Sequence, residues 1–191
     1  MKCGKNDLLS VVKEVKPTVL IGVSAQSGLF SSEVLQAMNA NCEYPIVFSL
    51  SNPTNCCECT AEEAYRATDG KCLFASGSPM PAYRNHHTLH FIPAQASNMY
   101  VFPGIGLAAS TGNLATIPNQ LFYIAARTIA SMVTVEEMKT RTLLPPMSKL
   151  RETACKVAAQ CIIYGSKKGL TRIQTPLDAE VFVKSKMWYP E

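Results

Sequence analysis

The stretch FSLSNPTNCCECTAEEAY, residues 48–65, contains the end of a strand, a sharp break and the start of a helix. The apolar run stops at Asn52-Pro53, which is typical of a turn because proline cannot donate to a sheet ladder. Thr60 and Glu63 then have the spacing of a capping box, which predicts that a helix begins after Thr60. A strand followed at once by a helix is typical of α/β folds with parallel sheets.

The segments around this stretch repeat the alternation. Strands are expected at TVLIGVS (18–24), PIVFSLS (45–51) and CLFAS (72–76), and helices at 6–15, 31–40 and 61–68. The first strand is apolar throughout, so we expect it to be buried. The first helix should bury one face, formed by Leu8, Leu9, Val12 and Val15. After residue 100 only helices are expected, at 118–132, 135–140 and 148–165, with Gly165 as the C-cap of the last.

The composition is poor in charge, with 17% charged residues and no Asp or Glu from Gly70 to Val135. Such a surface either binds something negative or is covered by a partner. The net charge of +4 is mild and the basic residues are scattered, which disfavours nucleic-acid binding. No apolar run approaches the roughly 18 residues of a membrane span, so we expect no membrane contact. The eight cysteines, without a secretory signal, are expected to be reduced thiols.

All three expected strands end in serine, at Ser24, Ser51 and Ser76, followed by small or turn-forming residues. Ligands of open parallel sheets bind beyond the carboxyl ends of the strands. Small side chains there would let a ligand approach the backbone. Turn formation alone would select the same residues, so both interpretations stay open.

Two other patterns were weighed as binding sites. Cys56, Cys59, His86 and His90 have the pairwise spacing of zinc ligands, but zinc fingers separate their pairs by about 12 to 15 residues, far fewer than lie between Cys59 and His86. The alternative is thiols in a loop and a polar hairpin that carries the histidines. The segment FPGIGLAAS (102–110) matches a relaxed dinucleotide fingerprint but lacks the acidic residue about 20 positions on. We expect its glycines to permit close helix packing instead.

Five motifs in this order and spacing resemble malic enzyme, the NAD(P)-dependent decarboxylating malate dehydrogenase. They are KPTVLIGVS, FSLSNPT followed by ECTAEEAY, FASGSP, MYVFPGIGL and LLPPMSKLRE, and the resemblance runs from about Lys16 to about Gly169. It implies that Asn52 contacts malate beside the nicotinamide ring. It also implies a second amide segment, in which Asn98 matches the second asparagine of the family's pair and Ser97 stands in place of the first. The substrate-binding residues are thus expected to be Asn52, Ser97 and Asn98, and the cofactor-binding residues Val23, Ser24, Ser51, Asn52 and Asn98.

The resemblance further implies that residues 1–191 form a single partial domain. Its fold would be the second half of a Rossmann-like doubly wound parallel sheet (1–115) followed by a C-terminal region of closing helices (116–191). Such a chain would bind NAD or NADP and help to convert malate to pyruvate and CO₂. The resemblance places the catalytic acid and base and the ligands of Mg²⁺ or Mn²⁺ in a missing N-terminal portion, so this chain would hold no catalytic residue and no metal ligand, and would be inactive alone.

For the full enzyme, the resemblance implies a homo-oligomer in the cytoplasm, or in a plastid or mitochondrion if a transit peptide precedes the missing domain. The alternative function is a non-catalytic α/β binding or assembly module derived from the same family.

Overall fold

The computed structural model describes residues 7–84, 90–174 and 176–189, except for the side chain of His90. The chain divides into two compact units, the first made of Met1–Ser97 with Val135–Leu144 and the second of Asn98–Thr134 with Pro145–Glu191. None of the helices in the described ranges is long and apolar enough to cross a membrane. The single partial domain expected from the sequence, with its division at residues 115 and 116, stays a prediction.

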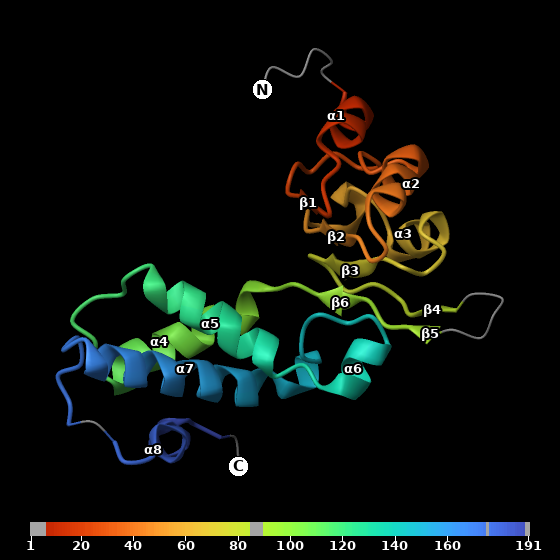
Figure 1. The fold of residues 1–191 in the computed structure, drawn as a ribbon. Coiled ribbons are helices and arrows are strands. Elements are labelled where there is room, and N and C mark those ends of the chain that lie inside the picture. The colour runs from red at the N-terminus through yellow and green to blue at the C-terminus, as the bar shows by residue number, and fades with distance from the viewer. Residues whose placement is uncertain (1–6, 85–89, 175, 190–191) are drawn as a thin grey trace. The chain divides into compact units, whose positions relative to one another are not determined.

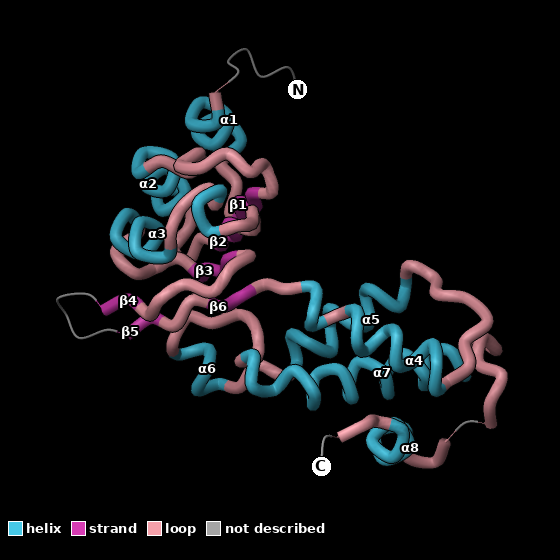
Figure 2. Tube along the Cα trace, turned by 180° about the vertical axis from the view of Figure 1, so that it is seen from behind, coloured by secondary structure: helices cyan, strands magenta, loops and turns pink. Residues whose placement is uncertain are grey.

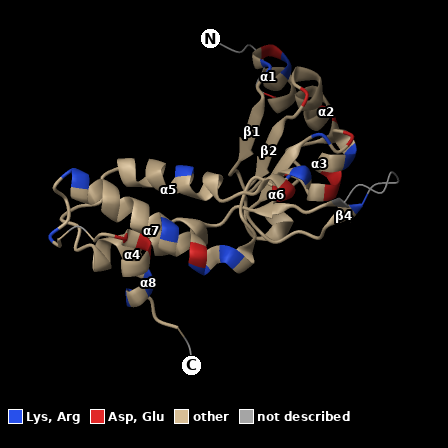
Figure 3. Cartoon of the chain, turned by 60° about the horizontal axis from the view of Figure 1, so that its bottom comes forward, with Lys and Arg blue, Asp and Glu red and all other residues tan. Residues whose placement is uncertain are grey.

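A four-stranded parallel sheet forms the centre of the first unit (Figure 1). Its strands are β1 (Val19–Gly22), β2 (Ile46–Ser49), β3 (Leu73–Ser76) and β6 (Ala94–Gln95), in the order β1-β2-β3-β6. The predicted strands and their parallel pairing are confirmed. The first three strands contain no charged residue, and the charged side chains of this unit gather on its helices (Figure 3).

Three helices lie on one side of this sheet, as the front and back views both show (Figures 1 and 2). They are α1 (Leu8–Val15), α2 (Ser32–Asn41) and α3 (Ala61–Ala67). Their N-cap residues are Asp7, Ser31 and Thr60 respectively, and the side-chain oxygen of each accepts a hydrogen bond from a backbone N–H of the first helical turn. The capping box of Thr60 and Glu63 is present with both of its reciprocal hydrogen bonds, which confirms the predicted helix start.

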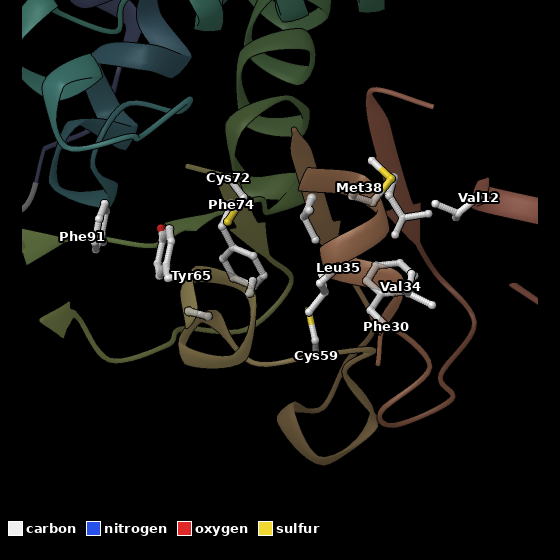
Figure 4. Packing of buried hydrophobic residues seen from close by; sticks show 14 residues of the cluster. Val12, Phe30, Val34, Leu35, Met38, Cys59, Tyr65, Cys72, Phe74 and Phe91 are labelled. Atoms are coloured by element: carbon white, nitrogen blue, oxygen red, sulfur yellow. The ribbon is translucent and has the colours of Figure 1, made fainter. Parts of the chain in front are cut away.

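The hydrophobic core of the first unit fills the space between these helices and the sheet. Tyr65 of α3 stacks on Phe91 with ring centroids 4.6 Å apart and also lies near Phe74 of β3. Gly70 has a φ of 72°, in the left-handed region that favours glycine, and a Cβ there would lie 2.4 Å from Cζ of Phe91. Figure 4 labels the main core residues, which are Val12, Phe30, Val34, Leu35, Met38, Cys59, Tyr65, Cys72, Phe74 and Phe91.

The opposite face of the sheet is partly open in the first unit, which corrects one prediction. Val19 and Ile21 of β1 are 44% and 57% exposed, whereas Leu20 between them is buried. β1 lies at the edge of the sheet, and α1–α3 all cover the other face, so the expectation of a fully buried strand is wrong for β1. Val15 of α1 is exposed too, so the predicted apolar face of that helix does not extend to its last residue.

Short elements complete the first unit. The strands β4 (Tyr83–Arg84) and β5 (His90–Phe91) pair antiparallel, in agreement with the hairpin that was the alternative to a zinc site. The helix α6 (Val135–Lys139) returns to this unit from later in the chain. The 3-10 turn η1 (Thr54–Cys56) follows the break after β2. His86, a candidate zinc ligand, lies outside the described residues.

The second unit is helical, as predicted. It contains η2 (Asn98–Tyr100), α4 (Phe102–Thr111), α5 (Gln120–Ser131), η3 (Met147–Lys149), α7 (Leu150–Lys167) and α8 (Ala179–Lys186). The long α7 packs against α4, α5 and α8. A Cβ on Gly104 of α4 would lie 2.5 Å from Cγ1 of Val157, so this glycine does permit close helix packing, as expected.

Gly165 is not the C-cap of α7, contrary to the prediction. The helix continues to Lys167, and Gly165 is a buried position inside it. A Cβ there would lie 2.8 Å from Leu114, so the glycine lets the segment around Leu114 approach the helix. The left-handed residue that ends the helix is Gly169, with a φ of 66°.

Candidate functional site

The carboxyl ends of the parallel strands β1, β2 and β3 lie side by side at the C-terminal end of the sheet, which is called the strand-end edge below. Their last residues, Gly22, Ser49 and Ser76, are paired in register. The ladder continues one step further, because the N–H of Leu50 donates to the carbonyl of Gly22 (2.9 Å) and that of Gly77 to the carbonyl of Ser49 (3.0 Å). The loops that follow the strands therefore begin from fixed backbone positions.

Glu58 is the residue of this edge that sequence reasoning missed. Its side chain is fully buried beneath the loops. Oε1 accepts from the backbone N–H of Ser24 (2.8 Å), from Oγ of Ser24 (2.9 Å) and from Oγ of Ser51 (2.5 Å). Oε2 accepts from Oγ of Ser49 (3.2 Å). One carboxylate thus joins the ends of β1 and β2.

The hydrogen bonds to Glu58 keep it ionised. Burial raises the pKa of a carboxyl group, but here the donors from Ser51 and Ser24 outweigh burial and lower the pKa from 4.5 to about 2. An ionised carboxylate only accepts hydrogen bonds, and here Oε1 accepts three and Oε2 accepts one. The signal in the sequence was the serine at each strand end, which was assigned to ligand approach or to turn formation.

Asn52 is exposed at the same edge and its amide is oriented by its neighbours. Nδ2 donates to the carbonyl of Leu50 (3.3 Å), and Oδ1 accepts from Oγ of Ser78. Gly77 makes this arrangement possible, because a Cβ at that position would lie 2.2 Å from the carbonyl oxygen of Leu50 and 2.7 Å from Nδ2 of Asn52. The peptide bond between Asn52 and Pro53 is cis. The second N–H of the Asn52 amide makes no hydrogen bond within the described residues.

The other expected cofactor residues of the first unit divide into two groups. Val23 and Ser24 are exposed in the loop after β1. Ser51 is buried, and its hydroxyl donates to Glu58 and accepts from the N–H of Ala25 (2.8 Å). Ser51 therefore shapes the loop, and so does the hydroxyl of Ser24, which donates to Glu58, whereas no described hydrogen bond engages the exposed side chain of Val23.

Ser97 and Asn98 lie where the first unit meets the second along the chain. Ser97 is half-buried and follows the carboxyl end of β6, the fourth strand of the same sheet. Asn98 is exposed and begins η2 of the second unit, where its carbonyl accepts from the N–H of Val101 (3.0 Å). The approach of Asn98 to the ligand of Asn52 stays a prediction.

The zinc site considered from the sequence, Cys56, Cys59, His86 and His90, stays untested, because His86 and the side chain of His90 lie outside the described residues. Of its two cysteines, Cys56 is half-exposed and Cys59 is buried, and burial raises the pKa of the Cys59 thiol, which disfavours the thiolate that zinc requires. Within the described ranges no group of three His, Cys, Asp or Glu residues could hold a metal ion. Mg²⁺ and Mn²⁺ prefer carboxylate oxygens, and Glu58 at this edge already accepts four hydrogen bonds.

Comparison with known proteins shows which family model and which relatives this chain matches. Residues 1–165 match the family model described as malic enzyme, NAD binding domain. The chain is 44% identical over 184 residues to the NADP-dependent malic enzyme of Dictyostelium discoideum, covering 96% of this chain and 34% of that protein. It is 39% identical over 186 residues to the mitochondrial NAD-dependent malic enzyme of Ascaris suum, covering 96% of this chain and 29% of that protein.

The fold has a solved counterpart. The crystal structure of Entamoeba histolytica malic enzyme superposes with a TM-score of 0.70 at 24% identity, covering 90% of this chain and 32% of that one. The chain spans about a third of the length of these relatives.

Proposed function

The chain belongs to the malic enzyme family, and we propose that it supplies part of the NAD(P)-binding domain of an enzyme that oxidises and decarboxylates malate. The products of that reaction are pyruvate, CO₂ and the reduced cofactor. The observation that carries the proposal is the oriented amide of Asn52 at the strand-end edge of a sheet that matches the family's NAD binding domain.

Asn52 is suited to orient malate. Its free N–H can donate to a carboxylate or hydroxyl oxygen of the substrate, and the amide adds no charge beside the reacting atoms. The hydrogen bond to Leu50 and the one from Ser78 limit the rotation of this amide, so little ordering is left to be done on binding. Ser97 and Asn98 are proposed as further substrate contacts, on the resemblance alone.

The edge also fits the nicotinamide end of NAD or NADP. The exposed side chains there are uncharged, and Val23 is free to contact a ring face, whereas the hydroxyl of Ser24 donates to Glu58. When bound, the cofactor supplies the hydride acceptor. Relatives named for both cofactors match the chain, so the choice between NAD and NADP is not assigned.

The remaining chemistry is proposed to come from outside this chain. At the strand-end edge, the buried carboxylate among the described residues is that of Glu58, and it already accepts four hydrogen bonds, so it is poorly suited to bind a divalent cation. We therefore propose that the acid, the base and the ligands of Mg²⁺ or Mn²⁺ belong to other parts of the enzyme, and that the full enzyme is a homo-oligomer. A cytoplasmic or mitochondrial location is consistent with the family, which includes a mitochondrial relative.

A chimeric enzyme tests the proposal. The chain replaces the segment that it matches in the Dictyostelium discoideum NADP-dependent malic enzyme, and malate-dependent reduction of NADP⁺ is followed by absorbance with Mn²⁺ present. We expect turnover that requires both malate and the inserted chain. A chimera that is folded by circular dichroism but inactive with NADP⁺ and NAD⁺ contradicts the enzymatic function and supports a non-catalytic module.

A further inference from the structure

The loop after β1 depends on Glu58 for its backbone hydrogen bonds. The N–H of Ser24 donates to Glu58 itself. The N–H of Ala25 donates to Oγ of Ser51 (2.8 Å) and that of Gln26 to Oγ of Ser24 (3.3 Å), and both of these hydroxyls donate to Glu58. Three consecutive amides are therefore held directly by this carboxylate or through one hydroxyl bonded to it.

The end of β1 is shaped around the same carboxylate. A Cβ on Gly22 would lie 2.5 Å from Cδ and 2.7 Å from Cγ of Glu58. Beyond its side chain, the backbone carbonyl of Glu58 accepts from the N–H of Phe30 (3.0 Å), where the loop after β1 ends. Glu58 thus contacts this loop at its beginning and at its end.

The loop after β2 meets Glu58 through two serines. Ser49 is the last residue of β2, and Ser51 directly precedes Asn52. The Ser49 hydroxyl also accepts from the N–H of Cys59 (3.2 Å), so its proton is directed to Glu58. Because Ser51 is bonded to Glu58, this carboxylate helps to fix the backbone position of Asn52.

We propose that Glu58 is a positioning residue for the reaction: its buried carboxylate holds the loops after β1 and β2 so that Val23 and Asn52 face one ligand. The inference rests on the proposed function. It assigns Glu58 no contact with malate or with the cofactor, because its side chain is fully buried and already accepts four hydrogen bonds.

The substitution Glu58→Gln tests the carboxylate with almost no change in volume. A glutamine keeps one oxygen and replaces the other by an NH₂ donor, which then faces a hydroxyl or the N–H of Ser24. The bonds that remain also lose the strength given by the charge. The control is Thr60→Ala, which removes the nearby N-cap of α3 and lowers stability without removing a hydrogen bond to Glu58.

The first measurement needs no activity. Amide hydrogen exchange is recorded residue by residue on the chain and on both variants. We expect Glu58→Gln to accelerate exchange at Ser24 and Ala25 by about tenfold or more relative to Thr60→Ala, since a lost charge-assisted bond is worth about that factor. Equal exchange at these two amides in both variants overturns the proposal.

The second measurement is kinetic and uses the chimeric enzyme. We expect Glu58→Gln to raise KM for both malate and NADP⁺, by about tenfold or more. Thr60→Ala should lower the melting temperature but keep both KM values. A folded Glu58→Gln enzyme with unchanged KM values contradicts positioning. If Glu58→Gln does not fold, Ser51→Ala, which removes one donor to Glu58 and the acceptor of the Ala25 N–H, must raise KM for malate for the proposal to stand.

The two measurements separate the failures. An unmodified chimera without activity contradicts the proposed function and leaves the exchange experiment as the test of Glu58 as a loop anchor. An active chimera whose KM values ignore Glu58→Gln contradicts this inference alone.

Discussion

At the strand-end edge, the neighbouring residues Ser51 and Asn52 differ in burial and in hydrogen bonding. Asn52 is exposed, and one N–H of its amide has no hydrogen bond within the described residues, whereas Ser51, the residue before it, is buried and holds Glu58. The resemblance to malic enzyme predicted a substrate contact for Asn52, which lies in the Ser-Asn-Pro break that is visible in the sequence. It missed Glu58, since glutamate is rarely fully buried and the convergence of Ser24, Ser49 and Ser51 on one carboxylate exists only in three dimensions.

Replacing Asn52 by alanine in the chimeric enzyme should reduce kcat/KM for malate. Loss of one partnered amide is worth about 1–3 kcal/mol, so we expect a fall of roughly tenfold to hundredfold, mainly through KM. The matched control is Asn55→Ala, because Asn55 is an exposed asparagine of the nearby turn η1. Equal kcat/KM in the two variants would remove Asn52 from the malate site.

Glu58 should also make the stability of the chain depend on acid pH. Its pKa is lowered from 4.5 to about 2 in the folded state, so its contribution is complete above about pH 4.5 and is lost as the pH falls toward 2. The difference in pKa corresponds to at most about 3 kcal/mol. Urea unfolding at pH 7 and pH 3 measures it, and the loss between the two should be smaller for Glu58→Gln. An equal loss in both proteins would mean that other carboxyl groups carry the pH dependence.

At the scale of the elements, helix starts were easier to predict than helix ends. Thr60 caps its helix as expected, because an N-cap is a local contact within one turn. The end of α7 was misplaced at Gly165, because that glycine serves a packing contact with Leu114 from a distant part of the chain. The true end at Gly169 uses the N–H of Leu170, which donates to the carbonyl of Gly165 (2.7 Å).

Two glycines of α4 form a matched pair for testing helix packing. Gly104→Ala places a Cβ 2.5 Å from Val157 of α7, whereas Gly106→Ala meets nothing within 4 Å. We expect Gly104→Ala to lower the free energy of unfolding by about 1–3 kcal/mol through overpacking. Gly106→Ala should instead raise it by up to about 1 kcal/mol through helix propensity. Urea unfolding followed by circular dichroism measures both, and the same sign for the two substitutions would show that Gly104 is not a packing position.

At the scale of the whole molecule, the sequence predicted the α/β rhythm and the helical second part, because both follow from local periodicity. The two-residue strand β6 and the return of α6 to the first unit were not predicted, since neither has a local pattern of its own. The exposure of Val19 and Ile21 was missed for a different reason. An apolar strand is expected to be buried on both faces, and only the arrangement of α1–α3 on one face of the sheet shows that β1 is covered on one side.

Each compact unit has its own buried thiols, so the opening of each hydrophobic core can be measured separately by the rate at which its thiols react. Cys57, Cys59 and Cys72 are buried in the first unit, and Cys155 and Cys161 in α7 of the second. Burial raises the pKa of all five, to about 11 for Cys72 and for Cys161, so they combine low access with little thiolate at neutral pH.

A thiol-labelling experiment on the reduced chain uses this difference. With a small alkylating reagent at pH 7.5 and peptide mass spectrometry, the half-exposed Cys42 and Cys56 should be modified first and the five buried cysteines slowly. Gly104→Ala loosens the contact between α4 and α7, so it should accelerate Cys155 and Cys161 by more than it accelerates Cys57, Cys59 and Cys72. Gly106→Ala is the control and should leave all rates near those of the unmodified chain. If Gly104→Ala accelerates all five buried thiols by the same factor, the two cores open together and the division into separately stable units is wrong.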